Sequence, residues 1–290
     1  MPPTPEEILS LAPEAADDLL DRLEREVPVS PRLVKLPARP FSEAVVFGDT
    51  HGDWRSTQRV VAAFLAEPGD RMLIGLGDYV DRSPEDCGYG SVANALYLLG
   101  LASRYPERVL LIKGNHELHR LVGVLPHDLA EEVDQLWGPE EERYHRIVAL
   151  LERGPYAAVS PSGVYFAHGG FPRTAPSARW ESLFDGAEDE LVLDVAWGEC
   201  GASRARRGVV PPFSEDDLAR FLKLSGTRLF LRGHDPDLTG RWVFGARCLT
   251  LHTSRLYERY GGVLFARVPL DRAVDAAKSV AIERLDETPV

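Results

Sequence analysis

The sequence predicts an α/β protein, because short apolar runs alternate along the chain with longer segments of helical periodicity. Five of the apolar runs lead into glycine together with Asp, Asn or His. In open α/β sheets, ligands bind at the carboxyl ends of the strands. We therefore expect the fold to gather carboxylate, amide and imidazole side chains at one edge of a sheet.

The expected elements follow one another in order. Apolar residues at helical spacing cover residues 5–26, with an interruption at Pro13, and the first strand-like run comes after them. The runs that we interpret as buried strands are residues 45–47, 72–74, 109–112, 164–167 and 229–231. Further helices fit residues 55–66, 91–105, 128–137, 140–153 and 214–225.

The last part of the chain has its own signals. The helix at residues 214–225 begins with Ser214, a suitable N-cap residue, and Asp217 follows three residues later. Three strand-like runs then lie close together, at residues 242–244, 248–251 and 263–268. Their close spacing predicts antiparallel pairs of strands.

Polar motifs follow the five strand-like runs. Gly-Asp-Thr-His-Gly begins at Gly48, Gly-Asp-Tyr-Val-Asp-Arg at Gly77 and Gly-Asn-His-Glu at Gly114. One such block alone would be ordinary turn chemistry. Five of them, all with oxygen or imidazole donors, indicate a site for hard or borderline divalent metals. The candidate ligands are Asp49, His51, Asp78, Asn115, His168 and His234.

With these motifs, the chain resembles the metal-dependent phosphoprotein phosphatases, the serine/threonine family within the calcineurin-like metallophosphoesterases. The similarity extends from about Phe41 to about Leu270. It includes segments outside the metal motifs: Tyr105-Pro106-Glu107, Asp194-Val195-Ala196-Trp197, Arg207-Gly208-Val209 and the loop from Thr250 to Tyr257. The resemblance implies a four-layer α/β/β/α sandwich, with two mixed sheets flanked by helices and the metals at one edge.

The resemblance also implies a division of the ligands. Asp49, His51 and Asp78 would hold one metal ion, and Asp78 would bridge to a second ion held with Asn115, His168 and His234. A carboxylate suits the bridging position because it has two oxygens to share. We expect two divalent ions, with Mn²⁺ active in vitro and Fe or Zn as alternatives.

Such a pair of ions, about 3.5–4 Å apart, would present a bridging hydroxide for direct attack on a phosphate ester. His116 is the expected general acid for the leaving group, with Asp81 as the residue that orients it. By resemblance, Arg82, Arg207, Tyr257 and Asn115 would bind the phosphate oxygens. The expected reaction is hydrolysis of phosphoserine and phosphothreonine in proteins, with phosphotyrosine as an additional substrate.

The other histidines are not assigned to the site. His252 follows a strand-like run, but the resemblance gives it no metal and its role stays open. We expect His119 to be a packing or surface residue and His127 and His145 to be solvated. Glu117 is expected to support its loop.

Two alternative functions remain. A dinucleoside polyphosphate hydrolase of the same superfamily would share the first motif, although the forms of the second and third motifs favour the protein phosphatase. A non-catalytic module that binds a phosphorylated partner would be expected to lack a ligand, and none is missing. The departures around the motifs, such as Ser83-Pro84 after Asp-Arg, leave the choice of substrate open.

Composition adds broader expectations. The 290 residues, 44% of them hydrophobic, suffice for one large domain, and no linker divides them. We expect a single domain at 1–290, with a metallophosphoesterase core at 41–270, a helical N-terminal extension at 1–40 and a C-terminal tail at 271–290. No apolar run is long enough to span a membrane, and no signal peptide is evident.

Charge and cysteines bear on partners and location. The net charge of −12 excludes a typical nucleic-acid binder. Cys87, Cys200 and Cys248 have no metal or redox spacing, which predicts reduced thiols in the cytoplasm. We expect a monomer whose partner is its phosphoprotein substrate, with no membrane or nucleic acid. The sequence identifies no regulatory partner.

Overall fold

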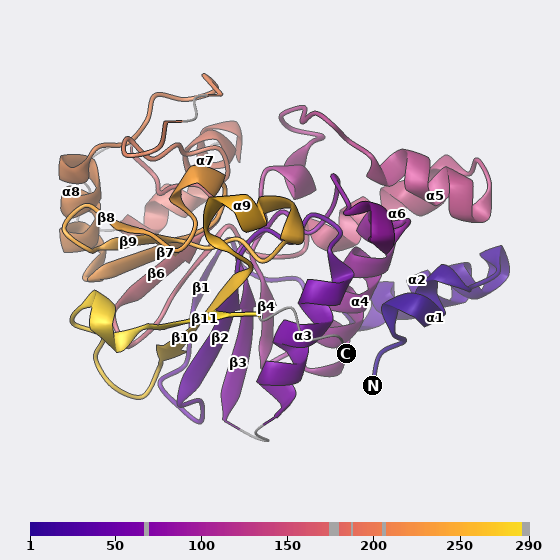
Figure 1. Ribbon diagram of the computed structural model, residues 1–290, viewed down its shortest axis with the longest axis horizontal. Helices are drawn as coiled ribbons and strands as arrows, with labels where there is room; N and C mark the ends of the chain where they lie inside the picture. The colour runs from indigo at the N-terminus through magenta and orange to yellow at the C-terminus, as the bar shows by residue number, and fades with distance from the viewer. Residues whose placement is uncertain (67–69, 174–179, 187, 205–206, 286–290) are drawn as a thin grey trace.

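The computed structural model describes residues 1–66, 70–173, 180–186, 188–204 and 207–285, and two mixed β-sheets form its centre (Figure 1). The first sheet consists, in spatial order, of β1 (Leu33–Lys35), β5 (Ala157–Val159), β6 (Val164–Ala167), β7 (Leu229–Arg232), β9 (Cys248–Thr250) and β8 (Trp242–Val243). The second consists of β11 (Ala281–Arg284), β10 (Leu264–Pro269), β2 (Glu43–Phe47), β3 (Arg71–Gly75) and β4 (Val109–Leu111).

The five strands predicted to carry site motifs pair in parallel within the sheets. In the second sheet β2, β3 and β4 are parallel, while β10 runs antiparallel to both β2 and β11. In the first sheet β6, β7 and β9 are parallel. The parallel strands bring their carboxyl ends to a common edge, as the sequence predicts.

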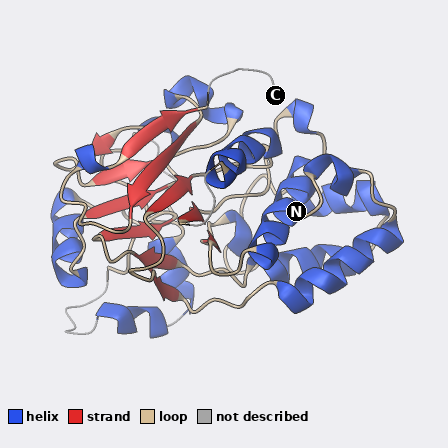
Figure 2. Cartoon of the chain, turned by 90° about the horizontal axis from the view of Figure 1, so that it is seen from below, coloured by secondary structure: helices blue, strands red, loops and turns tan. Residues whose placement is uncertain are grey.

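Helices cover the outer face of each sheet (Figure 2). Against the second sheet lie α1 (Pro5–Leu9), α2 (Pro13–Glu26), α3 (Trp54–Leu65), α4 (Gly90–Arg104), α5 (Leu129–Trp137) and α6 (Glu141–Leu151). Against the first sheet lie α7 (Glu188–Val195) and α8 (Glu215–Ser225), and the short α9 (Glu258–Gly261) follows Tyr257. The 3₁₀ helices are η1 (Glu85–Cys87), η2 (His116–Leu118), η3 (Trp180–Asp185), η4 (Pro236–Leu238), η5 (Arg255–Tyr257) and η6 (Ala277–Ser279).

The strand β2 shows why the layers form. Its side chains alternate in direction, so Val45 and Phe47 pack against the helices while Ala44 and Val46 face the other sheet. All four residues are almost completely buried. A short run that is apolar on both faces is therefore sandwiched between a helical layer and a second sheet.

The outer face of the first sheet completes the sandwich. Tyr165 of β6 and Phe230 of β7 pack with Phe221 of α8 in an aromatic cluster, and the Tyr165 and Phe221 ring centroids lie 4.8 Å apart. The order of layers is helix, sheet, sheet, helix. The predicted four-layer α/β/β/α fold is confirmed.

The predicted helices lie close to their expected positions. The break at Pro13 separates α1 from α2, and Ser214 caps α8 in a reciprocal capping box with Asp217. β8 and β9 form an antiparallel pair as expected, but β10 pairs with β2 in the other sheet. Four further elements, β1, β5, α7 and β11, were not predicted from the sequence.

The two ends of the chain contribute to the folded body. The α2 residues Leu19, Leu20 and Leu23 are buried in the core under the second sheet, and Arg143 of α6 forms an ion pair with Asp17. β11 adds a strand to the second sheet within the stretch that we expected to be a tail. Residues 286–290 of that expected tail lie outside the described residues. Among the described residues, no helix has the length and apolar character needed to cross a membrane.

Candidate active site

The strand ends that carry the predicted site have unusual backbone geometry. Among the described residues, seven non-glycine residues have a positive φ, and five of these belong to the predicted site: His51, Asp78, Asp81, Arg82 and His234. Such conformations are strained for residues other than glycine and persist where the surrounding structure holds them. Their concentration at one edge of the sandwich is independent structural support for a functional site there.

Glycines allow the motif loops to approach one another closely. Gly77 has φ +101°, and a Cβ atom on it would lie 2.4 Å from the backbone nitrogen of Gly114. A Cβ on Gly114 would lie 2.2 Å from Oδ1 of Asp78. Real Cβ atoms essentially never lie so close to another heavy atom. The second and third motifs therefore need glycine at these positions to place Asp78 next to Asn115.

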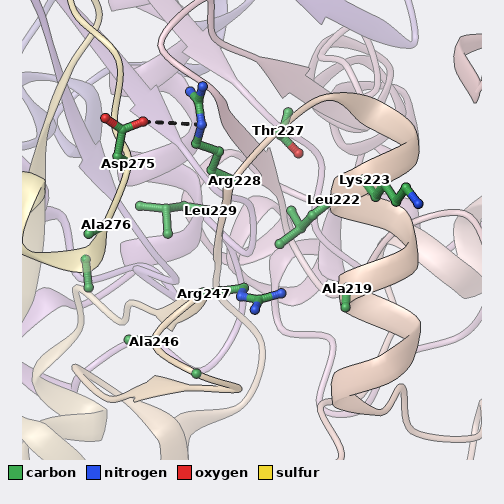
Figure 3. Close-up of a pocket in the computed structure, with 12 residues that line it drawn as sticks. Ala219, Leu222, Lys223, Thr227, Arg228, Leu229, Ala246, Arg247, Asp275 and Ala276 are labelled. Atoms are coloured by element: carbon green, nitrogen blue, oxygen red, sulfur yellow. Dashed lines mark ion pairs between the residues drawn. The ribbon is translucent and has the colours of Figure 1, made fainter.

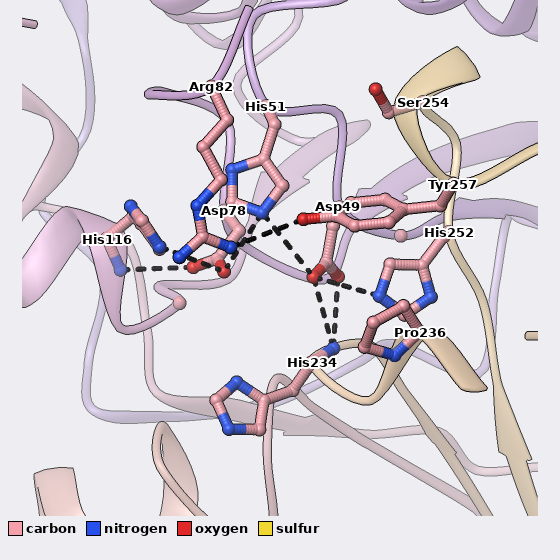
Figure 4. A network of polar contacts seen from close by, with 12 residues as sticks. Asp49, His51, Asp78, Arg82, His116, His234, Pro236, His252, Ser254 and Tyr257 are labelled. Atoms are coloured by element: carbon pink, nitrogen blue, oxygen red, sulfur yellow. Dashed lines mark hydrogen bonds and ion pairs between the residues drawn. The ribbon is translucent and has the colours of Figure 1, made fainter. Parts of the chain in front are cut away.

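A cleft of about 280 Å³ opens over these loops. It is lined by most of the predicted site residues, namely Asp49, His51, Asp78, Arg82, Asn115, His116, Arg207, His234 and Tyr257. Val124, Leu125, Trp197 and Val209 also line it. His168 and Asp81 are fully buried and contact residues of the cleft from behind. The structure thus brings every predicted site residue into one region. Figure 4 shows the part of this region around Asp49, Asp78 and His234.

One group of donor atoms is made of Asn115, His168 and His234. Asn115 Oδ1 lies 3.0 Å from both His168 Nε2 and His234 Nδ1, and these two nitrogens are 3.2 Å apart. His168 Nδ1 lies 2.9 Å from the carbonyl oxygen of Leu76, which can only accept, so Nδ1 carries a proton. In the neutral ring of His168, Nε2 then presents a lone pair, which is what a metal ligand needs.

The second group contains Asp49, His51 and Asp78. His51 Nδ1 donates to the carbonyl oxygen of Val80 at 2.9 Å, so Nε2 of the neutral ring is free to bind a metal. That Nε2 lies 3.6 Å from Asp78 Oδ2 and 4.0 Å from Asp49 Oδ2. Asp78 Oδ2 is also 3.3 Å from His168 Nε2. Asp78 thus stands between the two groups, where a bridging carboxylate would be.

The electrostatics of these groups favour cations. Burial would raise the pKa of Asp49, but His252 and His168 outweigh it and lower the pKa to about 2. Burial and the neighbouring His116 lower the pKa of His51 to about 4. The Asp49 carboxyl is therefore ionised and the His51 imidazole neutral at pH 7. This donor set fits divalent metal ions.

The pKa of His168 is shifted in the opposite direction to that of His51. Burial opposes protonation of His168, but the carboxylates of Asp78 and Asp49 outweigh it and raise the pKa of the imidazole to about 9. The same carboxylates would attract a metal cation at Nε2, and binding of that cation would release the proton.

His116 and Asp81 form a close pair beside the ligand groups. His116 Nδ1 lies 2.6 Å from Asp81 Oδ2, and both side chains are almost completely buried. Burial opposes protonation of His116, but the carboxylates of Asp78 and Asp81 outweigh it and raise the pKa of the imidazole. Asp81 Oδ1 accepts hydrogen bonds from the backbone amides of Asp128 and Leu129, which fix the carboxylate.

Two arginines lie on the rim of the cleft. The Arg82 guanidinium donates to the Tyr257 hydroxyl at 3.3 Å. Arg207 donates to the carbonyl oxygen of His234 at 2.6 Å and lies 3.2 Å from Asp235, so it is held next to a ligand. Asp235 in turn pairs with a fully buried arginine, Arg232, at 2.5 Å.

Glu117 has the supporting role that we expected. Its carboxylate accepts hydrogen bonds from the backbone amides of Asp78, Tyr79 and Gly114, all at 2.8 Å. It therefore ties the second motif to the third.

His252, to which the resemblance assigns no metal, lies in contact with a predicted ligand. His252 is fully buried, its Nε2 lies 3.2 Å from Asp49 Oδ2, and its Nδ1 lies 2.9 Å from the Thr239 hydroxyl. A signal was present, since His252 comes just after β9 as the other site residues follow their strands.

The expectation that His127 is solvated is wrong. Only 18% of its side chain is exposed, and Nδ1 lies 3.1 Å from Asp81 Oδ2. No sequence signal marks this contact, because His127 belongs to the loop before α5 and meets Asp81 only in the folded chain. His145 is half exposed, as expected.

Another cavity lies away from this edge. Its volume is about 410 Å³, and α8 and the residues around Arg228 and Asp275 line it (Figure 3). Arg228 and Asp275 form an ion pair at 3.3 Å, and the lining contains no imidazole among the described residues. Its residues offer no group of metal donors, so the cleft at the strand ends is the candidate active site.

The chain belongs to the calcineurin-like phosphoesterase family, whose sequence profile matches residues 44–238. The predicted resemblance is thereby confirmed. Membership of this family implies bound divalent metal ions, and the donor groups described above fit such ions.

Two curated relatives are serine/threonine phosphatases by name. A probable serine/threonine-protein phosphatase of Encephalitozoon cuniculi is 31% identical over 74% of this chain and 48% of its own length. A PP2A-like serine/threonine-protein phosphatase of Candida albicans is 27% identical over 85% of this chain and 59% of its own length. The chain thus spans about half the length of these relatives.

A solved structure supports the fold. A protein serine/threonine phosphatase from Saccharomyces cerevisiae with similarity to human PP5 superposes with a TM-score of 0.76 and 20% identity. The superposition covers 96% of this chain and 92% of the yeast chain.

Proposed function

We propose that the protein is a metal-dependent phosphoprotein phosphatase that hydrolyses phosphoserine and phosphothreonine. The observation that carries the proposal is the pair of His116 and Asp81, 2.6 Å apart, next to the two groups of metal donors. A metal site alone would serve many phosphoesterases. A positioned acid beside it fits an ester whose leaving group is an alkoxide. The names of the curated relatives support the same substrate class.

The chain's residues divide the work of the reaction. When two divalent ions are bound, they supply positive charge to the phosphoryl oxygens and activate water at neutral pH. Asp49, His51 and Asp78 would hold one ion, and Asp78, Asn115, His168 and His234 the other. The buried position of these ligands keeps the site's electrostatic interactions strong.

His116 would give its proton to the departing serine or threonine oxygen. An alkoxide is a poor leaving group, so proton transfer from a positioned acid contributes about 10²–10⁴-fold to such a step. Asp81 holds Nδ1 of the ring, which leaves Nε2 to face the substrate. The carboxylates of Asp78 and Asp81 raise the pKa of His116, which favours the imidazolium form that a proton donor needs.

Arg82 and Arg207 would bind the phosphate. Guanidinium groups donate in a planar fork that matches two phosphate oxygens, which suits a dianionic ester. Tyr257, hydrogen-bonded to Arg82, would fix that guanidinium or donate to the phosphate itself. Asn115 would lie close enough to the same oxygens to assist.

The finer predictions are also proposals. Mixed oxygen and imidazole donors without thiolate favour Mn²⁺ in vitro, with Fe or Zn as alternatives. We propose a cytoplasmic location on the basis of cysteine usage, a monomeric state, and a phosphoprotein substrate as the main partner.

Phosphate release by metal-stripped protein, before and after addition of Mn²⁺, tests the proposal. Phosphoserine, phosphothreonine and phosphotyrosine peptides are assayed beside a dinucleoside tetraphosphate. Manganese-dependent release from the first two peptides supports the proposal. Cleavage of the dinucleotide with inert peptides would establish the alternative polyphosphate hydrolase, and inactivity on all substrates by protein shown to bind two metals would favour a binding module.

A matched pair of variants assigns the activity to the site. His116→Asn removes the proposed acid, and His145→Asn makes the same change at a half-exposed histidine on α6. Loss of phosphopeptide hydrolysis in the first variant alone is the expected result.

A further inference from the structure

Three side chains form a polar cluster behind the candidate acid. His119 follows η2, His127 lies in the loop before α5, and Tyr144 belongs to α6. The rings of His119 and His127 stack with centroids 3.9 Å apart and planes 25° apart. The cluster touches the candidate active site where His127 Nδ1 lies 3.1 Å from Asp81 Oδ2.

The hydrogen atoms in this cluster can be assigned by elimination. The Asp81 carboxylate can only accept, so His127 Nδ1 donates to it. In neutral His127 the other nitrogen, Nε2, must accept, and the Tyr144 hydroxyl lies 2.8 Å away as its donor. The Tyr144 oxygen then accepts from His119 Nε2, with which it is in close contact. With neutral imidazole rings, each of these hydrogen bonds therefore has one donor and one acceptor, and donation runs from His119 through Tyr144 and His127 to Asp81.

The chain of donors ends on the same oxygen that orients His116. Asp81 Oδ2 accepts hydrogen bonds from His116 Nδ1 at 2.6 Å and from His127 Nδ1 at 3.1 Å. Asp81 Oδ1 accepts hydrogen bonds from two backbone amides. Hydrogen bonds to a carboxylate fix its orientation and spread its negative charge. The second imidazole donor therefore helps to fix where Asp81 points, and with it the orientation of the His116 ring.

We infer that His127, held by Tyr144, is a positioning residue for the candidate acid His116 and acts through Asp81. The inference rests on the proposed function, because it concerns the proton that His116 would give to the leaving group. His119 supports the assembly by stacking on His127 and donating to Tyr144.

The geometry gives the expected effect. Without the His127 donor, one of the hydrogen bonds that fix Asp81 Oδ2 is lost, and the carboxylate can turn away from His116 Nδ1. The ring of His116 is then oriented less well, and proton donation to an alkyl leaving group slows.

The experiment compares three variants in the metal-loaded full chain. His127→Ala removes the donor and should lower kcat for a phosphoserine peptide by about 10-fold, the scale of one hydrogen bond to a charged group, with KM unchanged. His127→Asn keeps an N–H close to the Nδ1 position and should recover most of the rate. Tyr144→Phe keeps the ring and removes only the hydroxyl, and should give an intermediate rate. His145→Ala, at the half-exposed neighbour of Tyr144, is the matched control and should behave as wild type.

A comparison of two substrates separates positioning from general damage to the fold. In His127→Ala, hydrolysis of p-nitrophenyl phosphate, whose leaving group needs no proton, should change little while hydrolysis of the phosphoserine peptide falls. Equal losses on both substrates would overturn the inference. An inactive wild-type protein would instead refute the proposed function.

A second measurement is independent of activity. The ring proton on His116 Nδ1 should give a strongly downfield NMR signal in the zinc-loaded protein, because its hydrogen bond to Asp81 is short. His127→Ala should shift that signal, and the control His145→Ala should not. An identical signal in wild type and His127→Ala would show that His127 has no influence on the pair of Asp81 and His116.

Discussion

Replacing Asp81 by asparagine should disable proton donation while leaving the architecture of the site in place. In the Asp81→Asn variant, the remaining side-chain oxygen can still accept from the backbone amides of Asp128 and Leu129, as Asp81 Oδ1 does at 2.8 and 3.1 Å. The amide nitrogen then faces His116 Nδ1, where a carboxylate oxygen was. His116 loses the partner that stabilises its imidazolium.

The expected loss can be estimated from the role of the acid. General acid catalysis contributes about 10²–10⁴-fold, and His116 itself remains present in the variant. We expect kcat for a phosphoserine peptide to fall about 100-fold, which corresponds to about 2.7 kcal/mol of transition-state stabilisation. Metal affinity should stay the same, because the side-chain hydrogen bonds of Asp81 go to none of the predicted metal ligands.

The assay compares two leaving groups. Hydrolysis of p-nitrophenyl phosphate releases a stabilised phenolate that leaves without a proton, so its kcat should fall much less than that for the peptide. The exposed Asp134→Asn on α5 serves as the matched control and should match wild type on both substrates. Equal losses on the peptide and on the aryl phosphate would refute the assignment of His116 and Asp81 to proton donation.

Three further predictions concern metal binding and stability. His252→Leu removes the buried partner of Asp49 and should weaken metal binding about 10–100-fold in a competition titration with a metal-sensitive dye; unchanged affinity would contradict a supporting role for His252. Burial raises the pKa of Glu132 to about 7, above its ordinary 4.5, so the folded state binds this proton more tightly than the unfolded state does. Between those two values, stability should fall as pH rises, by up to about 1.4 kcal/mol per pH unit. Urea unfolding at several pH values should show this fall in the free energy of unfolding for wild type and not for Glu132→Gln. The same pH dependence in both proteins would contradict the prediction. Asp235→Ala leaves the fully buried Arg232 without its carboxylate and should lower the free energy of unfolding by about 3–5 kcal/mol. A loss below about 1 kcal/mol in urea titrations would show that the pair is dispensable.

The fold was predictable where the apolar pattern agrees with the residues that begin or end an element. The strands β2, β3, β6 and β7 are short runs that are buried on both faces, and each is closed by a glycine-containing motif. The helix α8 has both halves of a capping box in its sequence. β11 was missed because its residues are only partly buried or exposed and its pairing with β10 is decided by tertiary contacts.

The site was only partly predictable, and it was predictable where a local pattern marks the residue. Each predicted ligand follows a strand, so the register of the sheet brings it to the shared edge. His127 has no such marker, since it belongs to the loop before α5 and meets Asp81 only in the folded chain. His252 does follow a strand, but its contact with Asp49 depends on how β9 lies relative to β2, which no local pattern contains.

The positive φ angles of His51, Asp78, Asp81, Arg82 and His234 limit how such a centre could be moved to another protein. At these positions the chain must supply a particular functional group and an unfavourable backbone conformation at the same residue. Grafting the side chains onto a regular strand or helix would reproduce the set of donors but not their directions. A transplanted version would have to import the loops as rigid units, together with the supporting glutamate and the glycines that let them touch.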